Sequence, residues 1–463
     1  GYSTFRVDIT DVCNEEGDNL LVIACSNELK DSVYPQSADF TFYGGLYRGV
    51  NLISVPDVHF DLEYYGGPGI QVTPRPCECG GAEFEIVSYV KGADENFTVL
   101  YSVCDAEGNE VASACRPADE TAVKVYVPDA TLWEIDAPYL YTVTARLQRR
   151  NESYDEISAR VGVRSFSCDP NKGFILNGTE TPLRGVSRHQ DMLYKGNALT
   201  KEDHYEDARM IKELGANTIR LAHYQHSQDF YDACDEMGFV VWAEIPFISV
   251  MNQDPDAHQN CISQLKELII QNYHHASIVT WGISNEITIK DKNRADMLDN
   301  HHMLNDLVHE LDPSRPTTLA CYAMCMPTHK VVHITDLVGY NLYLGWYVPF
   351  PWLNDLFLKG FHKIWPKRPL CYSEYGAEGM PNLHSEHPKR GDHTEEYQAV
   401  YHEYMLECFK RHPFMWGTYV WNMFDFAADA RDQGGEPGMN HKGLITFDRK
   451  IKKTVLSLQS LLE

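Results

Sequence analysis

Strand-like and helix-like segments alternate from about residue 170 to the end of the chain, and this alternation limits the fold more than any other feature. The strand-like segments are almost continuously apolar, as strands are when both faces of a parallel sheet are covered. Eight consecutive strand–helix units predict a TIM barrel, whose active site lies at the C-terminal ends of its strands. The eight predicted strands are residues 183–188, 218–223, 240–245, 278–284, 317–322, 337–342, 370–373 and 417–422.

The preceding residues have the pattern of antiparallel β-structure. Apolar and polar residues alternate over 97–103, as in a strand with one buried face, and turn-forming residues separate such strands as in an immunoglobulin-like sandwich. Earlier, short apolar runs such as 19–24 predict half of another β-sandwich. The predicted domains are therefore 1–77 (half a sandwich), 78–167 (immunoglobulin-like sandwich) and 168–463 (barrel).

Composition excludes several classes of partner. The chain has 40 Lys and Arg against 66 Asp and Glu, a formal charge of -26, which repels nucleic acid and anionic membranes. Its thirteen cysteines are dispersed and odd in number, so we expect reduced thiols and a cytoplasmic protein. Because the chain begins at Gly1 and runs directly into strand-like sequence, we interpret it as a fragment.

Two of the predicted barrel strands end in a glutamate. The fourth strand leads into Asn285 and Glu286, and the seventh leads into Glu374. An unpaired buried carboxylate is costly, so each glutamate must belong to an ion pair or take part in chemistry. Two glutamates at the mouth of one barrel favour chemistry.

Glycoside hydrolysis typically uses two carboxyl groups that face one cavity. Tyr343, Trp346, Tyr347 and Trp421 follow or end two other strands, where their rings can stack on a sugar. The chain has no Gly-rich phosphate loop, no nucleophile elbow and no H-E-x-x-H motif. The alternative from another class is a carbohydrate-binding protein without turnover, which would not need both glutamates.

These motifs together resemble glycoside hydrolase family 2, and within it the short bacterial β-galactosidases. The resemblance spans almost the whole chain. It implies a partial jelly-roll β-sandwich lacking its first half, an immunoglobulin-like β-sandwich and a C-terminal (β/α)8 TIM barrel, in a bacterial protein. The segments that carry it are 40–48, 132–141, 184–189, 220–224, 284–286, 345–347 and 373–376.

The resemblance also implies a role for individual residues. Glu374 would be the nucleophile and Glu286 the acid/base of a retaining double displacement through a covalent glycosyl-enzyme. Arg220 is expected to support the nucleophile carboxylate rather than to touch the substrate. The residues expected to contact or surround the sugar are Asp39, His189, His223, Asn285, Tyr343 and Trp421.

The two roles require two different pKa values. Burial and the charge of Glu374 should keep Glu286 protonated, while hydrogen bonds from Arg220 and Tyr343 should keep Glu374 ionised. A retaining mechanism predicts that the two carboxyl groups lie about 5–5.5 Å apart.

No metal and no cofactor is expected. Metal-dependent relatives carry acidic and His ligands after the third strand, where this chain reads Glu244 to Ser249, and it has Ala377 where they have a His. Gly49 also replaces an acidic residue common in the family.

The sequence limits the identity of the sugar less than it limits the type of reaction. The segment after Asn422 is most similar to the short β-galactosidases, so a terminal β-D-galactoside is the favoured substrate. Asn440 and Lys442, however, match the pattern with which β-glucuronidases bind a sugar carboxylate, and a β-glucuronidase is the alternative. The expected partner is thus a carbohydrate, and unpaired strand edges in the half-sandwich favour self-association.

Overall fold

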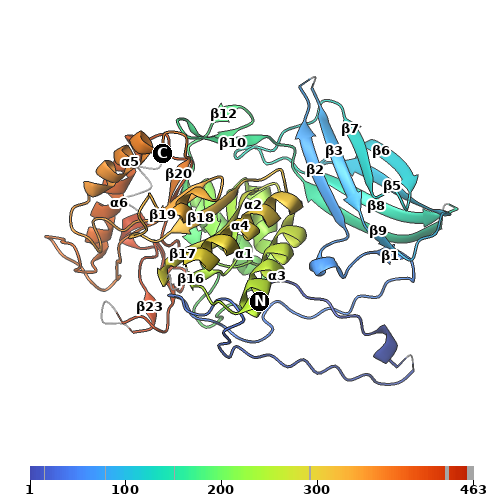
Figure 1. Cartoon of the computed structure of the whole chain (residues 1–463), viewed down its shortest axis with the longest axis horizontal. Coiled ribbons are helices and arrows are strands. Elements are labelled where there is room, and N and C mark those ends of the chain that lie inside the picture. The colour runs from blue at the N-terminus through green and yellow to red at the C-terminus, as the bar shows by residue number, and fades with distance from the viewer. Residues whose placement is uncertain (15, 79, 151, 291–293, 433–436, 456–463) are drawn as a thin grey trace.

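The computed structural model describes residues 1–14, 16–78, 80–150, 152–290, 294–432 and 437–455. Figure 1 shows a barrel with surrounding helices, a β-sandwich beside it, and a long N-terminal segment that runs beneath both. No helix in these ranges is long and apolar enough to cross a membrane.

The barrel is closed and parallel, and it contains all eight strands predicted from the sequence. The strand order is β15-β14-β13-β21-β20-β19-β18-β17, and pairing of β15 with β17 closes it. The TIM-barrel prediction is confirmed. The strands are β13 (Arg184–Arg188), β14 (Thr218–Leu221), β15 (Val240–Glu244), β17 (Ile278–Lys290), β18 (Thr317–Cys321), β19 (Val338–Asn341), β20 (Leu370–Tyr375) and β21 (Thr418–Val420).

Helices connect most of these strands on the outside of the barrel. Thr200 and Asp203 form a capping box at the start of α1, which fixes where that helix begins. Between β18 and β19 the connection contains the short 3-10 helix η3 (Lys330–His333) instead of an α-helix. The helices are α1 (Lys201–Glu213), α2 (Gln228–Met237), α3 (Pro255–Asn272), α4 (Arg294–Leu311), α5 (Leu353–Ile364) and α6 (Glu395–Lys410).

The sandwich consists of a three-stranded sheet, β2-β3-β7, and a four-stranded sheet, β6-β5-β8-β9. Alternate residues of β5 are buried, as predicted for 97–103. The sandwich begins before residue 78, because β2 pairs with β3 along its whole length. Its strands are β2 (Ile70–Pro76), β3 (Ala82–Ser88), β5 (Phe97–Cys104), β6 (Glu110–Pro117), β7 (Ala122–Val127), β8 (Tyr141–Arg149) and β9 (Glu152–Val161).

Short elements complete the described structure. The strands β10 to β12 form a small sheet between sandwich and barrel (Figure 1). β1 pairs with β4, β16 pairs in parallel with the end of β17, and β22 pairs with β23 near the barrel mouth. Their bounds are β1 (His59–Phe60), β4 (Val90–Lys91), β10 (Phe166–Asp169), β11 (Gly173–Leu176), β12 (Thr179–Glu180), β16 (Ile248–Val250), β22 (Phe426–Ala427), β23 (Met439–Asn440), η1 (Thr10–Val12) and η2 (Tyr64–Gly66).

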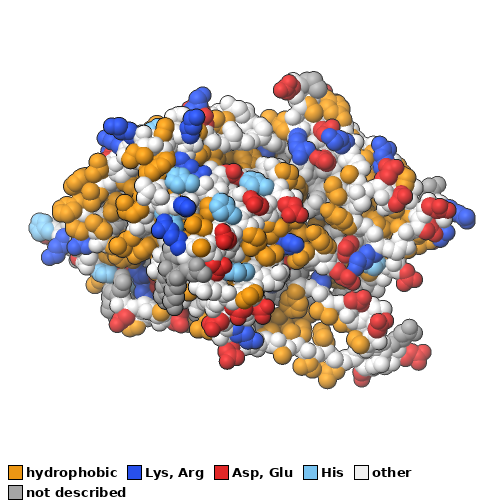
Figure 2. All heavy atoms as spheres, in the orientation of Figure 1, with side chains coloured by type: hydrophobic (Ala, Val, Ile, Leu, Met, Phe, Trp, Pro, Cys, Tyr) orange, Lys and Arg blue, Asp and Glu red, His pale blue; other side chains and the backbone are white. Residues whose placement is uncertain are grey.

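The strands predicted in residues 19–24 are not formed. Among the described residues of 1–57 the only regular element is η1, so this segment is extended and does not form the sheet expected there. A strand needs a neighbour for its backbone hydrogen bonds, and no strand in the described part of the chain pairs with residues 19–24. Its apolar residues consequently lie at the surface, with Leu20 90% and Val22 78% exposed. Hydrophobic side chains are visible on this segment, at the lower right of Figure 2.

Two aromatic anchors nevertheless hold the N-terminal segment against the barrel. Tyr34 is 1% exposed and packs in the barrel core, and Phe40 is 4% exposed beside the barrel mouth. The backbone N–H of Thr41 donates to the carbonyl of Ala427 in β22 at 2.9 Å. The segment therefore contributes residues to the surroundings of the predicted active site.

Candidate active site

The two predicted catalytic glutamates meet at the C-terminal mouth of the barrel. Glu374, in β20, accepts hydrogen bonds from Arg220 Nη1 at 2.8 Å and from the Tyr343 hydroxyl at 2.6 Å. Glu286, in β17, accepts one from Asn341 Nδ2 at 3.0 Å. Asn341 ends β19 and pairs in register with Glu374, so one residue connects the surroundings of both carboxylates.

Irregularities in β17 and β20 aim these side chains. In a regular strand neighbouring side chains point to opposite faces, yet both Asn285 and Glu286 contact Asn341. The β17–β18 register shifts between Gly282 and Asn285, and Glu286 has φ 53°, in the left-handed region. A bulge of this kind re-aims side chains next to an active site.

β20 has an irregularity of the same kind. The β19–β20 register shifts so that Asn341 pairs with Glu374, whereas the preceding pair joins Tyr340 to Tyr372. Ser373 is thus an extra residue, and its hydroxyl donates to Asn341 Oδ1 at 2.7 Å while Glu374 faces the mouth. Both adjacent side chains therefore reach the same site.

Arg220 is the centre of a buried ion network beneath the glutamates. It is fully buried in β14, donates to both oxygens of Glu244, at 2.9 and 3.1 Å, and also donates to Asn285 Oδ1 at 2.8 Å. His223 Nδ1 lies 2.7 Å from Glu244 Oε1. Glu244 therefore holds Arg220 in place as Arg220 holds Glu374, the supporting contact expected of it.

The surroundings of the two glutamates give them different acidities. Removal from water and the nearby charge of Glu374 raise the pKa of Glu286 to about 8. Burial also raises the pKa of Glu374, but the Arg220 guanidinium and the Tyr343 hydroxyl oppose that rise. Of the two glutamates, Glu374 is the one with a cation in contact, and this favours the ionised form of Glu374 over that of Glu286.

Aromatic rings form one wall of the site. Trp421 stacks on the imidazole of His223, with ring centroids 4.9 Å apart, and His189 meets Trp421 edge-on at 5.3 Å. Phe40 from the N-terminal segment packs on His189 at 4.9 Å. Burial lowers the pKa of both histidines, so they are neutral. The structure thus brings together three of the residues predicted to line the sugar pocket.

A cluster of four charged residues lies next to this wall: Asp39, Glu378, Arg431 and Lys442. Lys442 Nζ donates to Glu378 Oε1 at 3.0 Å, and Arg431 Nε donates to the same oxygen at 3.1 Å. Arg431 also pairs with Asp39. Burial opposes ionisation of Glu378, but His393, Lys442 and Arg431 outweigh burial and lower its pKa.

The four-charge cluster is connected to Glu374 through two tyrosines. Lys442 Nζ donates to the Tyr347 hydroxyl at 2.8 Å and lies 5.6 Å from the ring centroid of Tyr343, which contacts Glu374. Asn440 is buried, and its Nδ2 donates to Asp39 Oδ2 at 3.4 Å. The predicted residues Asp39, Asn440 and Lys442 therefore form a group at the edge of the site.

Sequence reasoning did not assign roles to Asn341 and Glu378. Asn341 is the last residue but one of a predicted strand, and Glu374 directly follows another, so the position of Asn341 carried a signal, but an amide is a weaker indication of chemistry than a carboxylate. Glu378 lies four residues after Glu374, beyond the strand end, and only the fold reveals its cationic partners.

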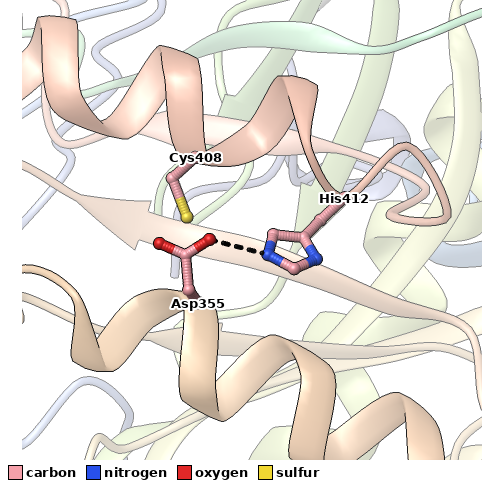
Figure 3. A group of neighbouring side chains, drawn as sticks. All are labelled: Asp355, Cys408 and His412. Carbon is pink, nitrogen blue, oxygen red and sulfur yellow. Dashed lines mark hydrogen bonds and ion pairs between the residues drawn. The ribbon is translucent and has the colours of Figure 1, made fainter.

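Two groups of side chains among the described residues have ligand atoms close enough for a metal: Asp355, Cys408 and His412, and Asp232, Asp235 and His275. In the first group, shown in Figure 3, Asp355 joins α5 to the end of α6. Its carboxylate already accepts from Arg411 Nη2 at 2.9 Å and from the Tyr404 hydroxyl at 2.9 Å. Because of those partners, we interpret Asp355 as a structural contact between α5 and α6.

Both the barrel and the sandwich match one protein family. Residues 170–463 match the model "Glycosyl hydrolases family 2, TIM barrel domain", and residues 70–164 match "Glycosyl hydrolases family 2". The chain is 33% identical to a β-glucuronidase of Bacteroides fragilis, over 98% of this chain and 67% of that protein. It is 27% identical to a β-galactosidase of Bacteroides ovatus, over 96% of this chain and 58% of that protein.

A solved structure extends the comparison. The FMN-binding β-glucuronidase from Facaelibacterium prausnitzii L2-6 superposes with a TM-score of 0.96 at 58% identity, covering 99% of this chain and 71% of that one. A putative β-glucuronidase of Formosa agariphila is covered over only 56% of its length, so some relatives are much longer than this chain. With a family model matching most of its residues, and with this barrel and these paired glutamates, the chain belongs to glycoside hydrolase family 2.

Proposed function

We propose that the protein is a retaining β-glucuronidase, which cleaves terminal β-D-glucuronides. The observation that carries the choice of sugar is the buried amino group of Lys442, held with Asn440 beside the tyrosine that contacts the nucleophile. A β-galactoside, the substrate favoured from the sequence, becomes the second candidate, supported by relatives named β-galactosidases.

Charge explains the preference for a sugar acid. A carboxylate at the sugar C6 position accepts a charge-assisted hydrogen bond from Lys442, and such bonds are about twice as strong as neutral ones. A galactoside offers only a hydroxyl there, and burying a lysine against a hydroxyl gains less. Lys442 and Arg431 both donate to Glu378 Oε1, so a sugar carboxylate would be a second acidic partner of an ammonium group that already has one.

The proposed reaction has two steps. The Glu374 carboxylate attacks the anomeric carbon while protonated Glu286 gives its proton to the departing glycosidic oxygen. Glu286, now ionised, takes a proton from a water that attacks the anomeric carbon and releases the sugar from Glu374. We expect the two carboxyl groups to lie about 5–5.5 Å apart, as in retaining enzymes.

The first experiment tests the reaction itself, on nitrophenyl β-glycosides with Glu374→Gln and Glu286→Gln variants. Either change should lower kcat by several orders of magnitude. The Glu286→Gln variant should keep more activity on a dinitrophenyl glycoside, because that leaving group needs little protonation. Sugar binding without turnover by the unchanged chain would favour the non-catalytic binding protein instead.

The second experiment tests the sugar. In Lys442→Met, kcat/KM on a nitrophenyl β-glucuronide should fall about 10²-fold or more, while that on the β-galactoside changes less than about tenfold. Lys363→Met, at an exposed lysine of α5, is the matched control and should change neither value. A wild-type preference for the galactoside that survives Lys442→Met would reverse the assignment.

FMN binding is a second candidate property, supported by the 58% identity to a β-glucuronidase described as FMN-binding. It goes against the expectation of no cofactor. Glycoside hydrolysis transfers no electrons, and the residues around Glu286 and Glu374 give a flavin no step to perform. Quenching of FMN fluorescence on titration with the chain, with riboflavin as the comparison, tests this property.

A further inference from the structure

We propose that Asn341 is a positioning residue that orients both the acid/base Glu286 and the sugar-binding amide of Asn285, an inference that rests on the proposed hydrolytic function. Asn341 is 1% exposed at the end of β19. Its Nδ2 donates to Glu286 Oε1 at 3.0 Å and to Asn285 Oδ1 at 3.1 Å.

The orientation of the Asn341 amide is fixed by its third contact. The Ser373 hydroxyl donates to Asn341 Oδ1 at 2.7 Å, so rotating the amide by half a turn would lose this bond and both bonds from Nδ2. An amide nitrogen has two hydrogens, and here each has its own acceptor. Ser373 is available for this contact because of the bulge in β20.

The contact determines which oxygen of Glu286 carries the acidic proton. The carbonyl oxygen of a protonated carboxyl group is its better acceptor, so the bond from Asn341 to Oε1 favours the form with the proton on Oε2. That oxygen then donates to the departing glycosidic oxygen, and in the second step takes a proton from water. The bond from Asn341 also lowers the pKa of Glu286, against the effects of burial and of Glu374.

The same amide sets the orientation of Asn285. Asn285 Oδ1 accepts from both Asn341 Nδ2 and Arg220 Nη2, the latter at 2.8 Å. With its oxygen held between two donors, Asn285 directs its own NH2 group away from them, where it can donate to a sugar hydroxyl. One side chain thus coordinates proton transfer with sugar binding.

The test compares Asn341→Ala and Asn341→Asp with the unchanged chain. Glutamate labelled with 13C at the side-chain carboxyl carbon lets NMR follow the titration of Glu286, with Glu286→Gln assigning the signal. Loss of the donor should raise the pKa of Glu286 by about half a unit or more in Asn341→Ala. It should rise further in Asn341→Asp, which keeps the volume of the side chain and adds a negative charge.

Steady-state kinetics of the two Asn341 variants provide the second measurement. For both variants kcat/KM on a phenyl glycoside should fall about 10²-fold, and on a dinitrophenyl glycoside less than about tenfold, because only the poor leaving group needs the proton. Asn217→Ala is the matched control: Asn217 also makes two side-chain hydrogen bonds, but it precedes β14 at the opposite end of the barrel. It should change neither the pKa nor the ratio between substrates.

The outcomes separate the two proposals. An unchanged pKa of Glu286 together with equal losses on both substrates would leave Asn341 a merely structural role and overturn this inference. Absence of hydrolysis by the wild-type chain would overturn the proposed function, and the NMR titration would still decide whether Asn341 orients Glu286. Circular dichroism identifies a variant that fails to fold, and the isosteric Asn341→Asp then provides the result.

Discussion

The proposed role of Glu286 follows from its surroundings, because burial and the charge of Glu374 raise its pKa to about 8. A general acid must be protonated to act, so kcat/KM on a phenyl glycoside should decline above about pH 8, tenfold per unit. On a dinitrophenyl glycoside the decline should be much weaker. Initial rates from pH 5 to 10 check this, and equal alkaline declines for both substrates would contradict it.

The raised pKa of Glu286 also predicts a cost in stability. The unfolded chain releases this proton near the ordinary value of 4.5 and the folded chain near 8. The contribution of Glu286 to stability is therefore greatest below about pH 4.5 and is lost as the pH rises towards 8, by at most about 1.4 kcal/mol per unit.

Glu286→Gln removes this loss, so its free energy of unfolding should exceed that of the wild type by a margin that widens from pH 5 to pH 8. Denaturant unfolding at several pH values measures the margin. Glu110→Gln, at an exposed residue of β6, is the control and should show a constant margin. A margin that narrows with pH would show that Glu286 is not held in its neutral form.

At the scale of elements, α5 and α6 are tied by Asp355. Contact with Arg411 lowers the pKa of Asp355, and His412 Nε2 lies 3.1 Å from its Oδ1. Asp355→Asn should reduce the free energy of unfolding by about 1–3 kcal/mol without changing kcat or KM. Because the folded-state pKa is depressed, the difference should be complete at neutral pH and shrink as the pH falls below about 4.

A double-mutant cycle with Arg411→Gln separates the free energy of the Asp355–Arg411 ion pair from other effects of the substitution. A coupling free energy near zero would mean that the ion pair contributes nothing, as exposed pairs often do. A rise in Tm on adding Zn²⁺ to the wild type, absent in Asp355→Asn, would instead show that this group binds metal.

The strand elements explain why the sequence predicted the glutamates better than their neighbours. Apolar runs identify β17 and β20, and the residue after each run is read directly from the sequence. The bulge at Ser373 and the left-handed backbone at Glu286 leave no such trace, because each is a compromise between one strand and the strands beside it. Strand pairing therefore decided which neighbouring side chains share a face of the sheet.

At the scale of the whole molecule, the N-terminal segment has two kinds of surface. Phe40 and Asp39 face the active site, whereas Leu20 and Leu52 are 90% and 83% exposed. Exposed apolar groups and unpaired backbone in an extended segment favour association with another chain.

We therefore predict that the chain self-associates as its concentration rises, and that Leu20→Lys combined with Leu52→Lys shifts it towards the monomer without loss of activity. Sedimentation velocity over a hundredfold range of concentration, about 1–100 μM, measures this. Leu356→Lys, at an exposed leucine of α5, is the matched control. Self-association that is unchanged in the double variant would place the interface elsewhere.

The sequence by itself determined the eight barrel strands, the immunoglobulin-like pattern and the two glutamates, because apolar periodicity and strand ends are local properties of the chain. Apart from Arg220 and Tyr343, which the family resemblance implied for Glu374, the partners of those glutamates were decided by tertiary structure alone. Asn341 lies 55 residues from Glu286, and Arg431 lies 392 residues from Asp39. Such contacts form only when the barrel closes and the N-terminal segment packs across its mouth, so no local pattern could specify them.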